Sequence, residues 1–563
     1  MRFHLLGVGS IGSLFATHLS SLDSAQVRLI LRRKDLATQL LNPSSSADSS
    51  RHPHGTLKLE RDGLVRRSSN LEMELTRNPA EASSSRSTSP NRQTPKIDPS
   101  VWLRNDPIET LIVTTKAPQT LPALRHILPR LSSRSTIVLC QNGMGTLEGL
   151  LEKYWPEDRS DEIERERETN GGGLGSEDRW RVGPGGGRPS FICATTTHGA
   201  WRKGGGHFVH AGMGDIKFGV LPNRAVLSTI SNYPEPSWST PSQNPLLNPL
   251  STIDPTLEHL PLTPVTENLH TTISTLLSCT ELRPLWLPLP TLQIAQLQKL
   301  AVNASVNSLT ALMGVNNGAL IGSQKAKSLI ETVSNECGAV FAAHIAREEG
   351  RWIPPAPRLD SSSSSFDSQS DEETPTTDSP SFPPPLPDHH PLSPQSLLAH
   401  TLSVLFKTSS NISSTLSDLL PLHQNSTFTL DNAPSLPSRT EIDYINGYVT
   451  ALGRRYGIET PVVKALGEMV LLKEEMGRVG AIDRVWEGRK EKVVRESSRG
   501  ISRSPPREGE RRSIFSGRMG SPETRRSHER AEKYERIDRD NEERFRTREI
   551  ERIQRARGHD QGG

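Results

Sequence analysis

The chain begins with a short apolar run, Phe3 to Leu6, that leads directly into the pattern Gly7-x-Gly9-x-x-Gly12 and then into a helix-forming segment. A strand, a glycine turn and a helix in this order open a dinucleotide-binding unit of the Rossmann type. The first glycine permits a tight turn, the second lets backbone N–H groups approach a pyrophosphate, and the third lets the helix pack on the strand. The alternative is a purely structural turn. The predicted cofactor-binding residues are Gly7, Val8, Gly9, Ser10, Ile11 and Gly12.

Polar residues follow three further apolar segments that are typical of buried strands. Arg32 follows the strand predicted over 27–31, at the place where a Rossmann unit meets the adenosine ribose. An arginine there can pair with a 2′-phosphate and favours NADP, whereas an acidic residue would favour NAD. Lys116 and Asn142 each follow another such strand, so we expect both beyond the carboxyl ends of parallel strands, where a cofactor would lie. A solvated turn with loose cations is the alternative for Arg32.

Composition limits how much of the chain can form a packed core. A length of 563 residues would allow three or four domains, but only 33% of the residues are hydrophobic, 5% are aromatic and 43 are proline. Such a chain must contain long linkers or disordered segments. The first half alternates strands with helices, and the apolar helical run over 292–312 begins a mainly helical second half. We therefore expect two ordered domains.

The first expected domain is an α/β Rossmann-like domain over 1–290, with disordered insertions at about 41–107, 152–189 and 225–265 and with short strands near 56–59 and 71–75 inside the first of them. The second is an all-α domain over 291–488 with a disordered insertion at about 355–394, followed by a charged, disordered tail over 489–563. The Ser, Pro, Gly and charged residues of these segments are typical of chains that cannot build a core.

Lys299, Asn303 and Asn307 form a polar stripe on the apolar helix predicted over 292–312. Residues four apart advance a regular helix by about 40° beyond a full turn, so the three side chains share one face. Lys and Asn are costly to bury without partners, so the stripe faces water or a polar ligand. A protonated lysine can stabilise and protonate the oxygen of a carbonyl that accepts a hydride, which makes Lys299 the candidate general acid. In the alternative, the asparagine side chains form hydrogen bonds with nearby backbone and the lysine reaches solvent. The turn at 316–318 is expected to end this helix and to add hydrogen-bond donors at its C-terminal end.

Charge and cysteine content exclude several classes of protein. The net charge of +3 is too small to imply a nucleic-acid or membrane protein as a whole. The four cysteines are far apart and have no metal-ligand spacing, so no metal site is predicted. No apolar stretch is long enough to span a bilayer, and the N-terminal strand does not resemble a signal peptide. We expect a soluble cytoplasmic protein, and a mitochondrial location is the alternative. The charged tail is interpreted as a solvated segment, and an RNA-binding role is the alternative for it.

Seven segments resemble the 2-dehydropantoate 2-reductase family, also called ketopantoate reductase, and they occur in the family's order. They are GVGSIG at 7–12, TTKAPQ at 114–119, QNGMGTLE at 141–148, TTTHGA at 195–200, KLAVNASVN at 299–307, NISSTLSD at 411–418 and TEIDYINGY at 440–448. The resemblance implies reduction of 2-dehydropantoate to (R)-pantoate with NADPH, on the route to pantothenate and coenzyme A. It also implies a Rossmann-like domain joined to an all-α domain like that at the C-terminus of 6-phosphogluconate dehydrogenase, with the active site in the cleft between them.

The resemblance assigns roles to individual positions. Lys299 matches the proton donor. The matching NADPH-binding positions are Gly7 to Gly12, Arg32, Lys116, Asn142, Ala200 and Glu441. The matching substrate-binding positions are Asn142, Lys299, Asn303, Asn307, Asn317, Asn411 and Ser414. Thr440 is expected to cap the helix that starts TEIDYING, with Glu441 in its first turn.

The long insertions are foreign to the compact family pattern, so three functions stay open. The first is the family reaction on a small-molecule substrate. The second is reduction of another small branched 2-oxo acid, or a related hydroxyacid dehydrogenase reaction on the same architecture. The third, from another class, is a non-catalytic dinucleotide sensor with its tail as a docking arm. No membrane or nucleic-acid partner is expected, and a homodimer is left open.

Overall fold

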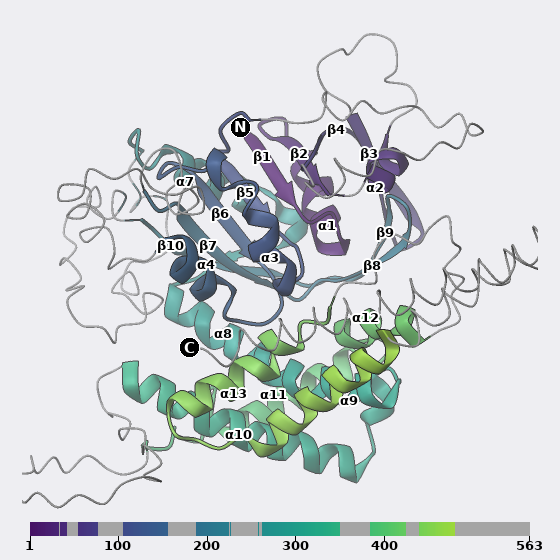
Figure 1. Ribbon diagram of the computed structural model, residues 1–563, viewed down its shortest axis with the longest axis vertical. Helices are drawn as coiled ribbons and strands as arrows, with labels where there is room; N and C mark the ends of the chain where they lie inside the picture. Colours follow the sequence, from purple (N-terminus) through teal and green to yellow (C-terminus); the bar gives the residue numbers. More distant parts are fainter. Residues whose placement is uncertain are drawn as a thin grey trace, which may run out of the picture. The chain divides into compact units, whose positions relative to one another are not determined.

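The computed structural model describes residues 1–32, 34–41, 54–76, 105–155, 187–223, 262–348, 383–423 and 439–478, together with positions 226, 257 and 260. The expected tail over 489–563 and most of the expected insertions lie outside these residues. The described residues form a sheet with flanking helices, followed by a helical domain (Figure 1).

The centre of the sheet is parallel, and it positions the carboxyl ends at which a cofactor would bind. Within the described residues the strand order is β11-β10-β7-β6-β5-β1-β2-β4-β3-β9-β8. The parallel strands are β1 (Arg2–Leu6), β2 (Gln26–Leu31), β4 (Leu64–Leu75), β5 (Thr110–Val113), β6 (Thr136–Cys140) and β7 (Ser190–Thr196). In register, Leu5 of β1 lies between Leu29 and Ile112. All three are fully buried, as is typical of strands covered on both faces.

The remaining strands extend the sheet at both sides. They are β3 (His54–Arg61), β8 (Gly199–Gly204), β9 (His207–Gly212), β10 (Ile216–Leu221) and β11 (Pro284–Trp286). Strand β10 runs antiparallel to β7, and β3 runs antiparallel to β4 but parallel to β9. The short strands predicted near 56–59 and 71–75 are present and are longer than expected, because β3 covers 54–61 and β4 covers 64–75, so the insertion predicted over 41–107 is wrong for this part of its length. Alternating burial along β3 buries Leu57 and Leu59 against the core.

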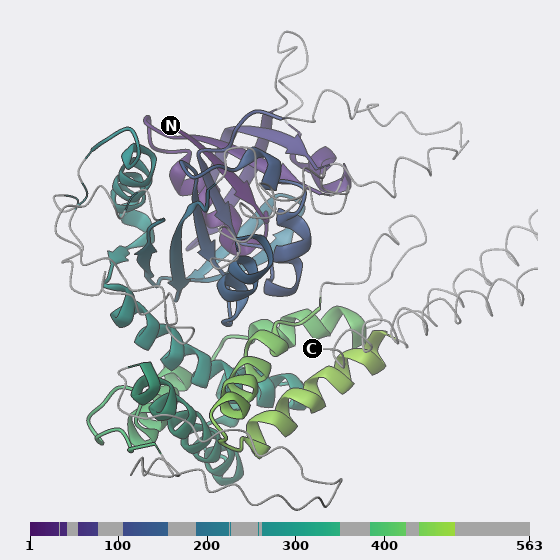
Figure 2. The same cartoon turned by 60° about the vertical axis from the view of Figure 1, so that its left-hand side comes forward.

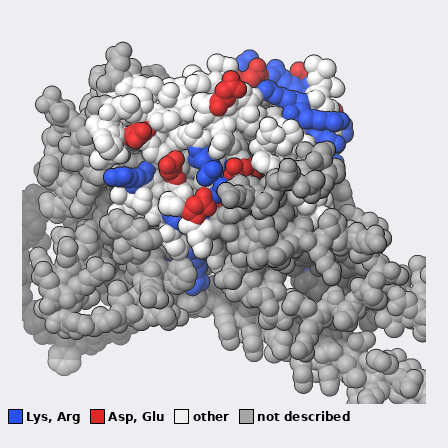
Figure 3. Space-filling view, turned by 90° about the horizontal axis from the view of Figure 1, so that it is seen from above, with Lys and Arg blue, Asp and Glu red and all other residues white. Residues whose placement is uncertain are grey.

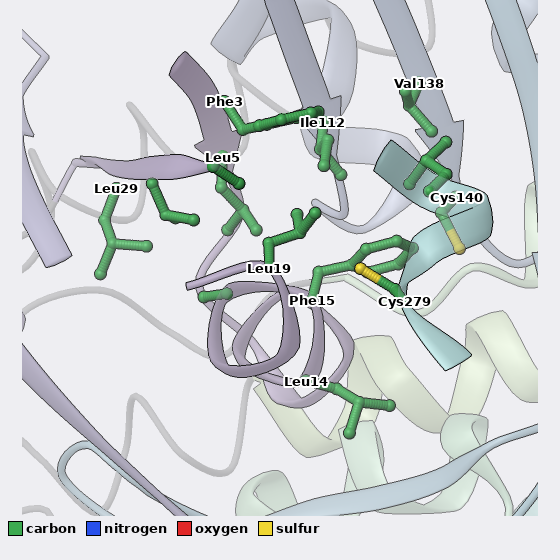
Figure 4. Packing of buried hydrophobic residues seen from close by; sticks show 14 of the residues in the cluster. Phe3, Leu5, Leu14, Phe15, Leu19, Leu29, Ile112, Val138, Cys140 and Cys279 are labelled. Atoms are coloured by element: carbon green, nitrogen blue, oxygen red, sulfur yellow. The ribbon is translucent and has the colours of Figure 1, made fainter. Parts of the chain in front are cut away.

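Helices cover the sheet, and α1 (Ser10–Leu19) packs directly on its centre. Figure 4 shows Leu19 of α1 directed toward the sheet and the Phe15 ring lying beside Cys279. Gly12 lets α1 approach the end of β1 closely, because it has no side chain. A Cβ at this position would lie only 2.1 Å from the carbonyl oxygen of Gly7. The other helices of this half are α2 (Lys34–Leu40), α3 (Ala117–Leu124), α4 (Thr146–Tyr154) and α7 (Glu267–Ser278).

The second half is helical, and α10 (Gln324–Glu348) runs through its core (Figure 2). Val333, Cys337 and Phe341 of α10 are fully buried at helical spacing. The other elements are α8 (Leu289–Val302), α9 (Ser308–Met313), η11 (Asn317–Leu320), α11 (Pro394–Lys407), α12 (Ser414–His423), η13 (Ile442–Tyr444), α13 (Asn446–Arg455) and a helix over 461–478. None of the described helices combines the length and apolarity that a membrane crossing requires.

Surface cations are concentrated locally. Strands β3 and β4 carry the exposed side chains of Lys58, Arg66 and Arg67. On the face seen in Figure 3, Lys and Arg gather toward one side, whereas both signs of charge are interspersed over the rest. This distribution agrees with a net charge of only +3 for the whole chain.

Candidate active site

In the glycine turn between β1 and α1, Gly7 and Gly12 pack tightly against the protein, whereas Gly9 between them has free space around it. Gly7 has a φ of +104°, a left-handed conformation that favours glycine. Its carbonyl accepts a hydrogen bond of 2.6 Å from the Thr114 hydroxyl. Gly9 directly precedes α1, and a Cβ built on it would meet no atom within 4 Å. The turn is therefore fixed by its neighbours and leaves room for an anion at the positive end of α1, so these residues fit a dinucleotide pyrophosphate.

One arginine directly follows β2 and another lies in β8, and the second of them contacts the glycine turn. Arg32 follows the last residue of β2, and its side chain is exposed. Ala200 lies in β8, and two residues further along that strand the Arg202 guanidinium donates a 3.3 Å hydrogen bond to the Val8 carbonyl. The same guanidinium lies 5.4 Å from the centre of the Phe208 ring, within the range of a cation–π contact. Strand β8 thus brings a cation against the glycine turn.

Lys116, beyond the end of β5, meets two carboxylates from the helical half. Its Nζ lies 3.0 Å from Asp418 Oδ2 and 3.3 Å from Glu441 Oε2. Glu441 is buried and also accepts hydrogen bonds from the backbone N–H of Ala117 at 3.1 Å and from the Asn142 amide at 3.4 Å. The polar residues beyond β5 and β6 and the Glu441 segment therefore form one cluster.

The charges of this cluster are strongly coupled. Burial opposes the charged form of Lys116, but Glu441 and Asp418 outweigh it and raise the pKa of Lys116 above its usual value. Burial raises the pKa of Asp418 to about 6, against the opposing effect of Lys116. One cation shared by two carboxylates leaves an excess negative charge when both are ionised. The ammonium therefore stays charged, and Asp418 takes up a proton as the pH falls through about 6.

Lys299 lies near the last turn of α8 and reaches the end of β7. Its Nζ donates hydrogen bonds to the Thr196 carbonyl at 2.8 Å and to the Thr195 hydroxyl at 3.2 Å. Both acceptors are neutral, and burial lowers the pKa of Lys299, with smaller opposing effects from Cys140 and more distant carboxylates. A lysine held in this way gives up its proton more readily than an exposed one, as a general acid must.

A π-helical turn interrupts the helix expected over 292–312. Residues Asn303–Asn307 form this turn between α8 and α9, so the regular spacing assumed for the polar stripe is wrong. A π turn leaves backbone carbonyls without their usual partners, and the Asn446 amide donates to the Ala304 carbonyl at 3.2 Å. Asn307 is buried and donates to the Ser414 hydroxyl at 3.3 Å. Asn303 is partly exposed and makes no side-chain hydrogen bond with the residues that the structure describes.

The segment before α12, together with α12 itself, connects the residues around Asn307 with those around Lys116. The Asn317 amide donates to the Thr408 hydroxyl at 2.9 Å, and its backbone N–H donates to the Asn411 carbonyl at 3.0 Å. The Asn411 side chain is exposed. Helix α12 then carries Ser414 and Asp418 one turn apart, so one helix contacts both Asn307 and Lys116.

Two expected helix ends differ from those observed. Helix α9 ends at Gly314, which has a φ of +70°, and not at the turn over 316–318. Glycine in the left-handed conformation ends a helix at low cost. Thr440 does not cap a helix, because its hydroxyl donates to the buried Glu474 carboxylate at 2.7 Å. Glu441 precedes the short turn η13, and α13 begins only at Asn446.

Comparison with known families covers both halves of this arrangement. The model described as Ketopantoate reductase PanE/ApbA matches residues 3–223, and the model described as Ketopantoate reductase PanE/ApbA C terminal matches residues 291–425 and 437–474. Together they span most of the chain, including the glycine turn, Lys299 and Glu441. The chain belongs to the ketopantoate reductase family. It is therefore an oxidoreductase of the class that acts on CH–OH groups, with the Rossmann-like and helical domains of that family.

Individual proteins are also similar to this chain. The chain is 27% identical to a "Probable 2-dehydropantoate 2-reductase" of Schizosaccharomyces pombe over 479 residues, which cover 84% of this chain and 96% of the relative. It is 23% identical to a 2-dehydropantoate 2-reductase of Vibrio cholerae over 383 residues, which cover 67% of this chain and 83% of the relative. A solved structure of D-mandelate dehydrogenase with NADH and anilino(oxo)acetate is 18% identical, with a TM-score of 0.48, and the match covers 85% of this chain and 99% of that one.

Four contacts of this ketopantoate reductase family member were not predicted from its sequence. Asp418 ends the motif NISSTLSD, and Thr195 and Thr196 begin TTTHGA, so the family motifs contained the signal. Their roles depend on partners about 100 to 300 residues away in the chain, which no local pattern reveals. Arg202 lies outside the seven motifs, and only the contact with Val8 identifies it.

Proposed function

We propose that this enzyme reduces 2-dehydropantoate to (R)-pantoate with NADPH, in the biosynthesis of pantothenate and coenzyme A. The family supports the class of reaction, and the relatives named above support the substrate. The observation that carries the proposal is the position of Lys299, whose ammonium is held by the end of β7, where both of its acceptors among the described residues are neutral. A 2-oxo acid bound against that ammonium would have its carbonyl oxygen beside a ready proton donor.

In the proposed site, each domain holds one reactant. The glycine turn Gly7 to Gly12 would hold the pyrophosphate, and Arg32 would pair with the 2′-phosphate of NADPH. Bound NADPH supplies the hydride that the carbonyl carbon accepts. Lys116, Asn142, Ala200 and Glu441 would line the nicotinamide side of the cofactor site, where Lys116 and Asn142 follow the ends of β5 and β6.

Lys299 would act as the catalytic acid. As negative charge develops on the substrate oxygen, the ammonium stabilises it and transfers a proton to it, which leaves a neutral amine. The lowered pKa of Lys299 favours this transfer. The polar side chains proposed to orient the acid by hydrogen bonds are Asn142, Asn303, Asn307, Asn317, Asn411 and Ser414. Neutral amides suit this role because they donate to a carboxylate or a hydroxyl without competing for the proton.

The decisive experiment follows NADPH oxidation at 340 nm by the purified full chain. The substrates are 2-dehydropantoate, its analogue without the 4-hydroxyl group, and an unbranched 2-oxo acid, each with NADPH and with NADH. The proposal expects the highest kcat/KM for 2-dehydropantoate with NADPH. A higher value for another acid would overturn the substrate, and a preference for NADH would overturn the cofactor. Cofactor binding without NADPH oxidation in the presence of any of these acids would favour the non-catalytic sensor.

A further inference from the structure

A second set of contacts joins the two domains on the far side of the Asn142 loop, and the proposed mechanism does not use it. The loop over 141–145 connects β6 to α4, and Met144 from this loop is buried within the core of the helical domain. The backbone N–H of Met144 donates to the Tyr444 carbonyl at 2.8 Å. The loop that carries Asn142 is therefore anchored in the other domain.

Two glycines of this loop allow the helical domain to approach. Gly143 and Gly145 have φ values of +81° and +91°. A Cβ on Gly143 would lie 2.4 Å from the Tyr444 carbonyl oxygen, and a Cβ on Gly145 would lie 3.1 Å from the Tyr448 ring. Any larger residue at Gly143 would clash with backbone, which cannot move aside cheaply. The loop conformation and the approach of 444–448 depend on each other.

Glu148 and Tyr448 connect the domains by side chains. Glu148 lies in the first turn of α4, and its Oε1 accepts a 3.3 Å hydrogen bond from the Tyr448 hydroxyl of α13. Burial raises the pKa of Glu148, while its own backbone N–H, the Tyr448 hydroxyl and the backbone N–H of Gly145 oppose this effect. One carboxyl therefore contacts the loop backbone, the start of α4 and the helical domain.

A cavity beside Glu148 makes its hydrogen bond with Tyr448 more important. Its walls include Gln141, Glu148 and Gln296, and Gln296 lies one turn before Lys299 on α8. On that side the loop is not fixed by close packing, so directed contacts must hold it. Loss of the hydrogen bond would let the loop shift, and Asn142 would shift with it.

We propose that Glu148 and Tyr448 form an interdomain latch that positions Asn142 for the reaction. The two residues are positioning residues, since neither belongs to the proposed cofactor or substrate site. Their effect passes through the loop to Asn142, whose amide is thereby kept beside Glu441 and Lys116. This inference rests on the proposed function only for its effect on turnover; the latch itself is a property of the fold.

The latch is tested first without turnover, by hydrogen exchange of the full chain measured by mass spectrometry. Tyr448→Phe and Glu148→Ala should accelerate exchange in the peptide over 141–148 roughly tenfold, as expected for loss of one hydrogen bond to a carboxylate. Glu148→Gln keeps an acceptor for the Tyr448 hydroxyl and should restore much of the protection. Tyr456→Phe is the matched control, because its hydroxyl bonds His344 within the helical domain at 2.9 Å. Unchanged exchange in both Tyr448→Phe and Glu148→Ala would overturn the latch.

The effect on catalysis is tested by a double-mutant cycle. Tyr448→Phe should lower kcat roughly tenfold, because Asn142 would lose its position beside Glu441 and Lys116. In an Asn142→Ala background the same substitution should have little further effect, because the residue that transmits the shift is gone. Equal losses in both backgrounds would overturn the positioning role. If none of the oxo acids supports NADPH oxidation by the wild-type chain, the proposed function is refuted instead. The hydrogen-exchange result would still decide the latch.

Discussion

Lys299 of the helical domain donates a 2.8 Å hydrogen bond to the backbone carbonyl of Thr196, the last residue of β7 in the Rossmann-like domain. A carbonyl cannot take the proton, and it leaves the ammonium free to give that proton to a substrate. The contact also crosses between the domains. Formation of the acid site therefore depends on how the domains are joined.

Replacing Lys299 by Ala should lower kcat by roughly 10² to 10⁴, the usual contribution of a positioned general acid. Stability should not fall in parallel, because the substitution removes an ammonium that is costly to bury. Steady-state kinetics with NADPH and 2-dehydropantoate measure the first effect, and a thermal midpoint measures the second. An unchanged kcat in a folded variant would remove Lys299 from the mechanism.

The pH dependence of kcat should report the same lysine. A general acid must be protonated, so kcat should fall as pH rises through the pKa of Lys299. Because burial lowers that pKa from its usual 10.5, the fall should have its midpoint below 10.5. The measurement is kcat against pH at saturating substrate, with the stability of the protein checked at each pH. A profile that stays flat up to 10.5 would contradict the assignment.

The sequence predicts this architecture well because its signals are local. The glycine turn, the apolar strands before Lys116 and Asn142, and the change to helical spacing near 292 are each visible within about twenty residues. The carboxyl ends of parallel strands meet at one edge, so the neighbourhood of Lys116 and Asn142 follows from topology alone. The Rossmann-like and helical domains are confirmed.

Features that depend on tertiary partners escape such reasoning. The π turn at 303–307 has the same apolar pattern as a regular helix, and Asn446 compensates for it from a distant helix. Thr440 is of a residue type that often caps a helix N-terminus, but its hydroxyl donates its hydrogen bond to the buried Glu474 carboxylate. Asp418 joins Lys116 across 302 positions. In each case a long-range contact outweighs the local preference.

Replacing Lys116 by Met should destabilise the protein by about 1–3 kcal/mol at pH 7.5, because Asp418 and Glu441 would be left without their cation. Without Lys116 the pKa of Asp418 should rise above its present value of about 6. Protonation then relieves the penalty, so the loss of thermal midpoint should shrink as pH falls to 5. Lys203→Met, at the exposed pair with Glu60, is the control and should change little. A loss that is independent of pH would contradict this account.

Arg32 should determine the choice between NADPH and NADH. Because its side chain is exposed and follows β2, Arg32→Asp should remove the pairing with a 2′-phosphate without disturbing the fold. We expect kcat/KM for NADPH to fall roughly 10- to 100-fold, the range of a charged hydrogen bond, with little loss for NADH. Arg67→Ala removes another exposed arginine, on β4, and serves as the control. Equal losses of kcat/KM for both cofactors would contradict the role of Arg32 in cofactor choice and would point to Arg202 instead.

Removal of residues 492–563 should leave kcat/KM unchanged. The match to the C-terminal family model ends at residue 474, and every contact proposed for the site lies before that position. The removed segment is rich in Arg, Glu and Ser, so any binding that it mediates should be electrostatic and should weaken steeply with salt. The assay compares NADPH oxidation by the full and shortened chains, and RNA binding by both at low and high salt. Activity that disappears with the tail would show that the tail contributes to the reductase, and a loss of RNA binding alone would make it an accessory.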